Sequence, residues 1–205
     1  MKSRMAAVTA ARQCQDIFQY IPAFSQFCRS GVSLRLKYYH RCDLSPKQIT
    51  WALDLTRQNM RTQYDHCGQE WKWNDKKKRA ELEDHEARYI IAQDSAQDPV
   101  AFAHIRFDSE EDIPQIYVYE LQLVEKVRGI RFGRMLMQTI ELAGCKLSME
   151  KVCLTVFKTN TAALNLYRSL SYVKDESDPS LHDIYDDSRY EILSKKLPIN
   201  NKFAA

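Results

Sequence analysis

The sequence lacks the features that mark secreted, membrane-spanning and metal-binding proteins. Its six cysteines include no CxxC pair and no metal-ligand spacing, so we expect free thiols in a reducing compartment and no metal site. No apolar run approaches the ~18 residues of a membrane span, and no secretory signal is present, so we expect no membrane partner. The basic, acid-free start at Met1–Arg12 leaves a transit peptide as an alternative to a structural segment.

An excess of charge of one sign is also absent. The formal net charge is only +3, so the composition does not call for a direct nucleic-acid partner. Hydrophobic residues make up 44% and charged residues 28% of the 205 residues, which is typical of one soluble globular domain with a sizeable core. Because no internal repeat and no exposed apolar stripe is evident, we expect a monomer.

Hydrophobic periodicity and turn residues predict an alternation of helices and strands. Ser45-Pro46 marks a strong helix start, with Ser as the cap and Pro at the first helical position. The pattern predicts a mixed α/β fold with a sheet flanked by helices. The expected helices are Ala6–Phe18, Pro22–Cys28, Ser45 to about Tyr64, Asp75–Glu83, Arg131–Lys146 and Thr161–Ser169, and the expected strands are Val32–Tyr39, Arg88–Gln93, Val100–Phe107, Tyr117–Val124, Lys151–Phe157 and Tyr190–Ser194.

The stretch Tyr117–Met135 is the centre of the chemical argument. An aromatic and branched strand feeds a basic loop that contains Gly129 and leads into a helix. The first N–H groups of a helix have no internal partner, the helix dipole favours an anion there, and glycine permits a close approach of the backbone. The stretch therefore suits a pyrophosphate, and a solvated basic turn is the alternative.

A second stretch, Asn160–Tyr172, follows the strand Lys151–Phe157 and reads Asn-Thr-Ala-Ala-Leu-Asn-Leu-Tyr at its start. In their order and spacing, the basic loop and this stretch resemble the GNAT superfamily of acyl-CoA N-acyltransferases. Its phosphate loop reads Arg/Gln-x-x-Gly-x-Gly/Ala and its later segment reads Asn-x-x-Ala-x-x-Leu-Tyr. Arg131 stands where the loop pattern has its middle glycine; this alters the backbone cup, and the Arg side chain could itself contact a phosphate. The matching residues are Arg128, Gly133, Asn160, Ala163, Leu166 and Tyr167.

The resemblance covers roughly residues 32–196 and implies a GNAT fold with a central mixed, mostly antiparallel twisted sheet. It also implies acetyl-CoA as co-substrate and Tyr167 as the acid beside the sulfur, with simple packing of that ring on the sheet as the alternative. The implied cofactor-binding residues are Gln122, Leu123, Val124, Arg128, Gly129, Ile130, Arg131, Phe132, Gly133, Arg134, Met135, Asn160 and Tyr167.

Longer runs include Trp51-Ala-Leu-Asp-Leu-Thr, Tyr117-Val-Tyr-Glu-Leu-Gln-Leu, Leu154-Thr-Val-Phe-Lys and Tyr190-Glu-Ile-Leu-Ser. These runs resemble the NatD family of N-alpha-acetyltransferases of core histones 4 and 2A, whose members acetylate tails that begin Ser-Gly-Arg-Gly. This resemblance implies histone tails as partners, a location in nucleus and cytoplasm, an N-terminal helical segment (1–31) packed on a catalytic domain (32–197), and a tail (198–205). The implied substrate-binding residues are Tyr64, Trp71, Asp108, Glu110, Tyr117, Tyr119, Thr155 and Tyr190.

The chemistry of acyl transfer to an amine identifies Glu120 as the candidate base. An α-amine has a pKa of ~7.7–8.0 and a lysine amine ~10.4, so an α-amine needs little help to lose its proton. Glu120 lies in an apolar, aromatic strand, where loss of hydration would make it a stronger base, directly or through a water. We predict catalytic roles for Glu120, Tyr119 and Tyr167; the alternative for Glu120 is a structural pair with an Arg or Lys.

Three further interpretations remain open at this point. Asp108 and Glu110 suit the Arg of a tail, but they also fit a solvated acidic loop over Asp108–Asp112. A further set of residues either surrounds the entrance of the site as an aromatic mouth or simply packs in the core. The set consists of Trp71, Tyr64, Tyr117, Tyr119 and Tyr190. As a whole, the chain could instead acetylate lysine side chains or a small amine, or be a binding module that has lost CoA through Arg131.

Overall fold

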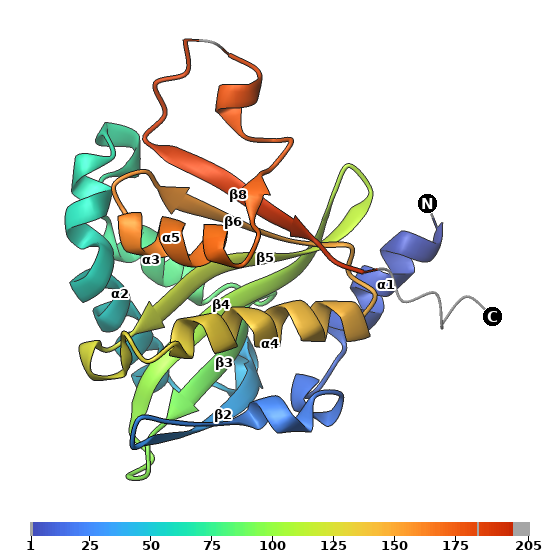
Figure 1. Cartoon of the computed structure of the whole chain (residues 1–205), viewed down its shortest axis with the longest axis vertical. Coiled ribbons are helices and arrows are strands. Elements are labelled where there is room, and N and C mark those ends of the chain that lie inside the picture. The colour runs from blue at the N-terminus through green and yellow to red at the C-terminus, as the bar shows by residue number, and fades with distance from the viewer. Residues whose placement is uncertain (1, 184, 199–205) are drawn as a thin grey trace.

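The computed structural model describes residues 2–183 and 185–198, and in this part of the chain one sheet runs through the molecule with α-helices on both faces (Figure 1). The strands are β1 Gln26–Arg29, β2 Val32–His40, β3 Arg88–Gln93, β4 Pro99–Glu110, β5 Ile113–Leu123, β6 Lys151–Phe157, β7 Val173–Lys174 and β8 Tyr190–Lys196. The α-helices are α1 Lys2–Arg12, α2 Pro46–His66, α3 Asp75–Leu82, α4 Phe132–Lys146 and α5 Thr161–Ser169. Short 3-10 helices are η1 Ile17–Gln19, η2 Pro22–Ser25, η3 Arg41–Asp43, η4 Gln69–Trp71, η5 Glu125–Val127 and η6 Pro179–Leu181.

The order of the strands is β1-β2-β3-β4-β5-β6-β8-β7, and all neighbours are antiparallel except β5 and β6. The parallel pairing runs from Gln115↔Lys151 to Val118↔Leu154. Among the described residues, β5 then continues from Tyr119 to Leu123 without a partner on β6. The two strands therefore separate towards one end of the sheet, and the predicted mixed, mostly antiparallel sheet is confirmed.

Two hydrophobic clusters fill the space between the sheet and its helices. The larger cluster joins α1, α4 and α5 to one face of the sheet and includes Phe132, Leu136 and Ile140 of α4. The smaller cluster joins α2 and α3 to the other face and includes Leu53 and Leu82. Burial of the apolar face of each helix holds it against the sheet, because an amphipathic helix is stable mainly through that face.

The N-terminal region differs from the prediction in two places. The first helix ends at Arg12 and does not reach Phe18, because the Asp16 side chain accepts a hydrogen bond from the Phe18 amide and starts a 3-10 helix there. The predicted helix Pro22–Cys28 is wrong in its second half, where strand β1 pairs with β2.

A tight turn explains strand β1. Ser30 and Gly31 both have positive φ angles, 52° and 75°, as a two-residue hairpin turn requires. β1 thus lies on the N-terminal side of the domain boundary predicted at residue 32, and α1 contributes Val8 and Ala11 to the main core. The tail predicted over 198–205 lies, beyond Pro198, outside the described residues.

The hairpin of β4 and β5 is longer than predicted. Asp108 and Glu110 belong to β4 and not to a loop, and only Glu111 and Asp112 form the turn, with φ angles of 48° and 63°. The two-residue strand β7 was not predicted, because so short a segment carries no periodic pattern. By contrast, the boundaries of β3, β6 and α5 agree with the prediction to the residue.

All six cysteines are free thiols, as predicted. Within the described ranges, no helix combines the length and the apolar character that a membrane crossing requires. Those ranges also contain no group of three or more His, Cys, Asp or Glu side chains placed to hold a metal ion.

Candidate active site

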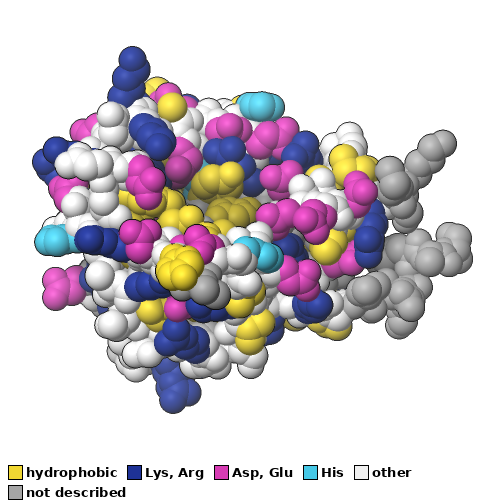
Figure 2. Space-filling view, turned by 90° about the horizontal axis from the view of Figure 1, so that it is seen from above, with side chains coloured by type: hydrophobic (Ala, Val, Ile, Leu, Met, Phe, Trp, Pro, Cys, Tyr) yellow, Lys and Arg dark blue, Asp and Glu magenta, His cyan; other side chains and the backbone are white. Residues whose placement is uncertain are grey.

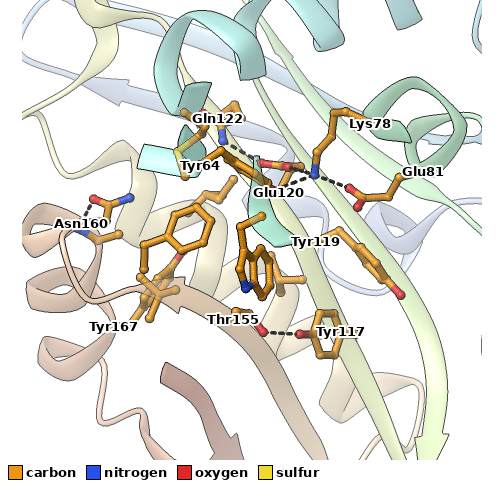
Figure 3. A pocket seen from close by; sticks show the side chains of 17 residues that line it. Tyr64, Lys78, Glu81, Tyr117, Tyr119, Glu120, Gln122, Thr155, Asn160 and Tyr167 are labelled. Carbon is orange, nitrogen blue, oxygen red and sulfur yellow. Dashed lines mark hydrogen bonds and ion pairs between the residues drawn. The ribbon is translucent and has the colours of Figure 1, made fainter. Parts of the chain in front are cut away.

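The separation of β5 from β6 opens a cavity of about 230 Å³ in the sheet. A bulge in β5 accompanies it: His104 lies opposite Glu120 and the next residue, Ile105, lies opposite Val118, which leaves Tyr119 as the extra residue. Glu120 of β5 and Tyr167 of α5 both line this cavity (Figure 3). The candidate base and the candidate acid are therefore on the same side of the molecule.

A buried cluster of charged groups surrounds Glu120. Lys78 Nζ lies 2.8 Å from Glu120 Oε1 and 2.7 Å from Glu81 Oε1, with the Lys78 and Glu120 side chains 7% and 4% exposed. Lys78 also donates to the Tyr64 hydroxyl over 2.9 Å. Burial alone would lower the pKa of Lys78, but the attraction of Glu120 and its neighbours outweighs burial and raises it, so Lys78 stays charged. The sequence alternative of a Glu paired with a Lys is thus present in the structure.

The ion pair leaves Glu120 open to the cavity. Gln122 Nε2 donates to Glu120 Oε2 over 2.7 Å, so each carboxylate oxygen accepts one strong hydrogen bond from the protein. A carboxylate has about four acceptor positions, and two remain for a water or an amine in the cavity. Pairing with Lys78 therefore orients the carboxylate and still leaves acceptor positions that face the cavity.

Aromatic rings form the opposite wall. Tyr64 packs edge-on to Phe157 with ring centroids 4.9 Å apart, and Trp71 packs on Phe157 and on Tyr190 at 5.4 and 5.0 Å. Burial and the charge of Glu120 raise the pKa of Tyr64 to about 12, so its hydroxyl stays protonated at neutral pH. Tyr190 touches Trp71 but is not among the residues that line the cavity.

The two β5 tyrosines occupy different environments. The Tyr117 hydroxyl lies 2.6 Å from Thr155 Oγ1, a contact across the strand separation. Tyr119 stacks on His104, with centroids 4.9 Å apart, and the Arg106 guanidinium carbon lies 4.2 Å from the Tyr119 ring centroid. His104 is fully buried, and burial lowers its pKa well below the usual value, so it is a neutral support for the Tyr119 ring.

Tyr167 keeps its proton in this site. Burial first, and then the negative charge of Glu120, raise the pKa of Tyr167. A phenol of this kind remains a hydrogen-bond donor at neutral pH, which suits stabilisation of a thiolate beside it. Tyr167 and Glu120 line the same cavity, so the charge of Glu120 acts on the Tyr167 hydroxyl.

The basic loop and the start of α4 form a groove of about 440 Å³ that continues into the cavity. The two share wall residues, including Gln122, Asn160 and Tyr167. The first intrahelical bond of α4 runs from the Met135 amide to the Arg131 carbonyl, so the preceding amides point out of the helix end. This is the geometry expected for a pyrophosphate site.

Arg131 has a left-handed backbone conformation, which glycine adopts without strain. Its φ is 67° and its ψ is 14°, and it is the N-cap of α4. The loop thus holds an Arg at a position whose backbone angles favour glycine. Gly129 also has a positive φ of 74°, with nothing within 4 Å of an added Cβ, so its backbone angle and not space accounts for glycine there.

The predicted cofactor residues do not all face the groove. The Phe132 side chain is buried and packs on Phe27, so only its backbone can reach a ligand. Three residues, Val124, Ile130 and Met135, pack partly buried against the core and are not groove-lining. The predicted residues that line the groove are Gln122, Leu123, Arg128, Gly129, Arg131, Phe132, Gly133, Arg134, Asn160 and Tyr167.

Asp108 and Glu110 lie outside the cavity. Asp108 is 54% exposed, with Arg12 3.7 Å away, and Glu110 pairs with Lys151 at 2.9 Å. Alternate residues of a strand share a face, so Asp108 and Glu110 lie on the same face of β4 as His104 and Arg106. His104 is the residue of β4 that lies opposite Glu120. Asp108 is close enough to influence the pKa of Tyr119. Figure 2 shows a hollow with hydrophobic side chains in it and Asp and Glu side chains around its rim.

Sequence reasoning missed three residues of this site: Lys78, Glu81 and Asn59. Lys78 and Leu82, four residues apart, are the buried positions of α3, which is the pattern of an inward helix face. That spacing was the available signal, but four basic residues at Lys76–Arg79 gave α3 the appearance of a solvated helix.

The model of the Acetyltransferase (GNAT) family matches residues 53–172 of this chain. The chain belongs to the GNAT acetyltransferase family. The match covers α2 from Leu53 onwards, the cavity, the loop and α5, and members of this family use acetyl-CoA, so the prediction of this co-substrate is confirmed.

Solved structures share the fold of this GNAT acetyltransferase. A GNAT-family acetyltransferase from Listeria monocytogenes has a TM-score of 0.57 at 13% identity, over 84% of this chain and 99% of that chain. Arabidopsis thaliana NAA60 in complex with a bisubstrate analogue has a TM-score of 0.56 at 10% identity, over 80% and 99%. Ard1 from Thermoplasma volcanium has a TM-score of 0.56 at 14% identity, over 80% and 98%.

The chain's own residues fit acetyl-CoA. Exposed amides at a helix start and the side chain of Arg131 suit the pyrophosphate, and the groove leads from them to the cavity that holds Glu120 and Tyr167. The alternative of a binding module that has lost CoA through Arg131 finds no support here, because the amides at the start of α4 point out of the helix end and the groove beside them leads to the cavity.

Proposed function

We propose that this GNAT acetyltransferase transfers the acetyl group of acetyl-CoA to the free N-terminal amine of core histones 4 and 2A, whose tails begin Ser-Gly-Arg-Gly. The observation that carries the proposal is the cavity shared by Glu120 and Tyr167, joined directly to the loop groove. The choice of substrate rests on the runs that resemble the NatD family and on the aromatic and acidic surroundings of the cavity. We further propose a monomer that acts in nucleus and cytoplasm.

Glu120 takes the proton of the attacking amine, directly or through a water. An α-amine has a pKa of ~7.7–8.0, so a modest base is enough to supply the neutral form. The co-substrate supplies an acetyl thioester: the new N–C bond forms, the C–S bond breaks, one proton leaves the nitrogen and one reaches the sulfur. Tyr167 donates a hydrogen bond where negative charge develops on that sulfur, while Tyr119 and Tyr117 orient the peptide.

Asp108 lies at a suitable distance to bind the Arg at the third position of the tail. It is four residues beyond His104, which faces Glu120, and a strand rise places it about 13 Å along the sheet. Two residue steps of an extended tail cover about 7 Å, and the Arg side chain spans the remainder. Its exposed contact with Arg12, at 3.7 Å, is weak enough for a substrate Arg to replace it.

Replacement of Asp108 by Ala is expected to raise the KM for a Ser-Gly-Arg-Gly peptide about tenfold, because a hydrogen bond to a charged group is lost. The KM for acetyl-CoA should change less than about twofold, since Asp108 is remote from the groove. Steady-state kinetics with each substrate varied gives both values. Glu111→Gln, which removes a charge from the adjacent exposed turn, is the matched control. Equal peptide KM values for Asp108→Ala and wild type would refute the assignment.

Mass spectrometry tests the reaction itself. After incubation with acetyl-CoA, a Ser-Gly-Arg-Gly peptide that ends in several lysines should gain one acetyl group, on the N-terminal nitrogen. The same peptide with a blocked N-terminus should gain none. Undiminished product from the blocked peptide would show lysine acetylation and would overturn the proposal.

A further inference from the structure

A continuous chain of side-chain hydrogen bonds connects the cofactor loop to Glu120. Arg128 Nη2 donates to Asn59 Oδ1 over 2.6 Å, and Asn59 Nδ2 donates to Gln122 Oε1 over 2.9 Å. Gln122 Nε2 donates in turn to Glu120 Oε2 over 2.7 Å, the last link, which is drawn in Figure 3. The chain therefore passes from the loop through α2 to β5.

Only one direction of donation satisfies every link. A guanidinium has donors and no acceptor, so Arg128 must find the oxygen of Asn59. The Asn59 amide nitrogen is then turned towards Gln122 and also donates to the Leu123 carbonyl over 3.2 Å. This places the oxygen of Gln122 towards Asn59 and its nitrogen towards Glu120. Arg128 thus fixes the orientation of two amides and presents a donor to the carboxylate.

Burial makes this orientation matter. As whole residues, Gln122 and Glu120 are each 5% exposed, so the loss of the hydrogen bond between them is costly. Arg128 donates to the Leu123 carbonyl as well, through Nε over 3.1 Å and Nη2 over 2.9 Å, and so ties the loop to the end of β5. The loop that receives the cofactor and the strand that carries Glu120 are therefore joined in two ways, through Asn59 and at the Leu123 carbonyl.

We propose that Asn59 is a positioning residue that carries the orientation set by Arg128 in the cofactor loop, through Gln122, to the carboxylate of Glu120. The inference rests on the proposed role of Glu120 in the reaction. It assigns to a helix residue outside the reacting atoms the task of keeping a donor on Glu120 Oε2. The other oxygen receives Lys78, so both orientation-setting contacts come from the protein.

Asn59→Asp is the sharpest test, because it preserves size and keeps an oxygen for Arg128 but removes the donor to Gln122. The Gln122 amide must then turn to donate to Asp, and its oxygen meets Glu120 Oε2. We expect kcat to fall about ten- to a hundredfold, the range for one hydrogen bond to a charged group. Because Asn59 also lines the groove, the added negative charge is expected to weaken CoA binding, so kcat is compared at saturating acetyl-CoA and the Kd of CoA is measured separately by calorimetry.

Two further variants distinguish the proposed relay, in which hydrogen bonds transmit the orientation from Arg128 to Glu120, from a purely structural role of Asn59. Gln58→Glu adds the same charge on the exposed face of α2 and should leave kcat and the Kd of CoA unchanged. Gln122→Met removes the second and third links, those to Asn59 and to Glu120, and should lower kcat by itself. In the Gln122→Met background, Asn59→Asp should lower kcat only slightly further, because the effects of residues that act through one another are not additive. Melting temperatures of all variants check that each one folds.

The outcomes distinguish this inference from the proposed function. If Glu120→Gln is inactive while Asn59→Asp keeps kcat within about twofold of wild type, the relay is refuted and the base stands. Full additivity of Asn59→Asp and Gln122→Met would also refute the relay. An undiminished kcat for Glu120→Gln would instead overturn the role of Glu120, and with it the proposed role of the hydrogen bonds that lead to it.

Discussion

Replacement of Glu120 by Gln is expected to lower kcat about 10²- to 10⁴-fold, the usual contribution of a positioned general base. Gln keeps the shape and the hydrogen-bonding oxygen but cannot take a proton. Lys78 retains Glu81 at 2.7 Å as a partner, so the variant should fold. The groove does not include Glu120, and the Kd of CoA should therefore stay within about twofold of wild type.

The measurement pairs a continuous thiol-release assay with calorimetry of CoA binding. Glu141→Gln is the matched control, because Glu141 is also a buried Glu in an ion pair, with Lys195 at 2.6 Å, but is remote from cavity and groove. The control should retain wild-type kcat. A kcat for Glu120→Gln within about threefold of wild type would show that another group, or bulk water, accepts the proton.

Replacement of Lys78 by Met is expected to destabilise the protein by about 3–5 kcal/mol, because it leaves buried carboxylates without their cation. For a chain of this size the melting temperature should fall by roughly 10 °C. Both Glu120, whose side chain is 4% exposed, and Glu81, at 29%, lose the same partner. The exposed neighbour Lys76 provides the control: Lys76→Met should shift the melting temperature by no more than about 1–2 °C.

The stability deficit of Lys78→Met should depend on pH. Burial raises the pKa of Glu81 in the intact protein, and the attraction of Lys78 opposes that rise. Without Lys78 the pKa of Glu81 rises further, so the folded state binds more protons than the unfolded state. The stability that such a group contributes is fully present below its unfolded pKa, ~4.3, and is lost as pH rises through the folded pKa. The deficit should be smaller at pH 5 than at pH 8.

Thermal melts of wild type and variant at both pH values provide the test, and the double variant Lys78→Met/Glu120→Gln should recover part of the loss because it removes one unpaired charge. A deficit below about 1 kcal/mol, equal at pH 5 and pH 8, would contradict the view that Lys78 neutralises this cluster.

The sequence predicted the fold well where local patterns are strong. Helix α2 begins at Ser45 with both bonds of a capping box, and strands β3 and β6 have apolar cores with clear limits. Strand β1 was mistaken for a helix because its four residues carry little pattern of their own. Pairing with β2 across the turn at Ser30-Gly31, a non-local contact, decides its conformation.

The site was predictable only in part, for a related reason. Glu120, Tyr167 and the loop could be recognised from strand and helix positions. The partners of Glu120 could not, because Lys78 and Asn59 come from helices that are adjacent to β5 only after folding. Asp108 and Glu110 share a strand face with the site, yet Glu110 is already paired with Lys151, a contact that no sequence pattern indicated.

The end of β5–β6 pairing at Val118 and Leu154 has a consequence for handling the protein. Among the described residues, Tyr119–Gln122 has no strand partner on the β6 side, and unpaired strand edges can pair with other extended chains. Acetyl-CoA and a bound tail would both shield this seam. Storage with the cofactor should therefore slow self-association in a concentrated preparation. In the empty enzyme, the unpaired backbone groups remain available to pair with strands of neighbouring molecules.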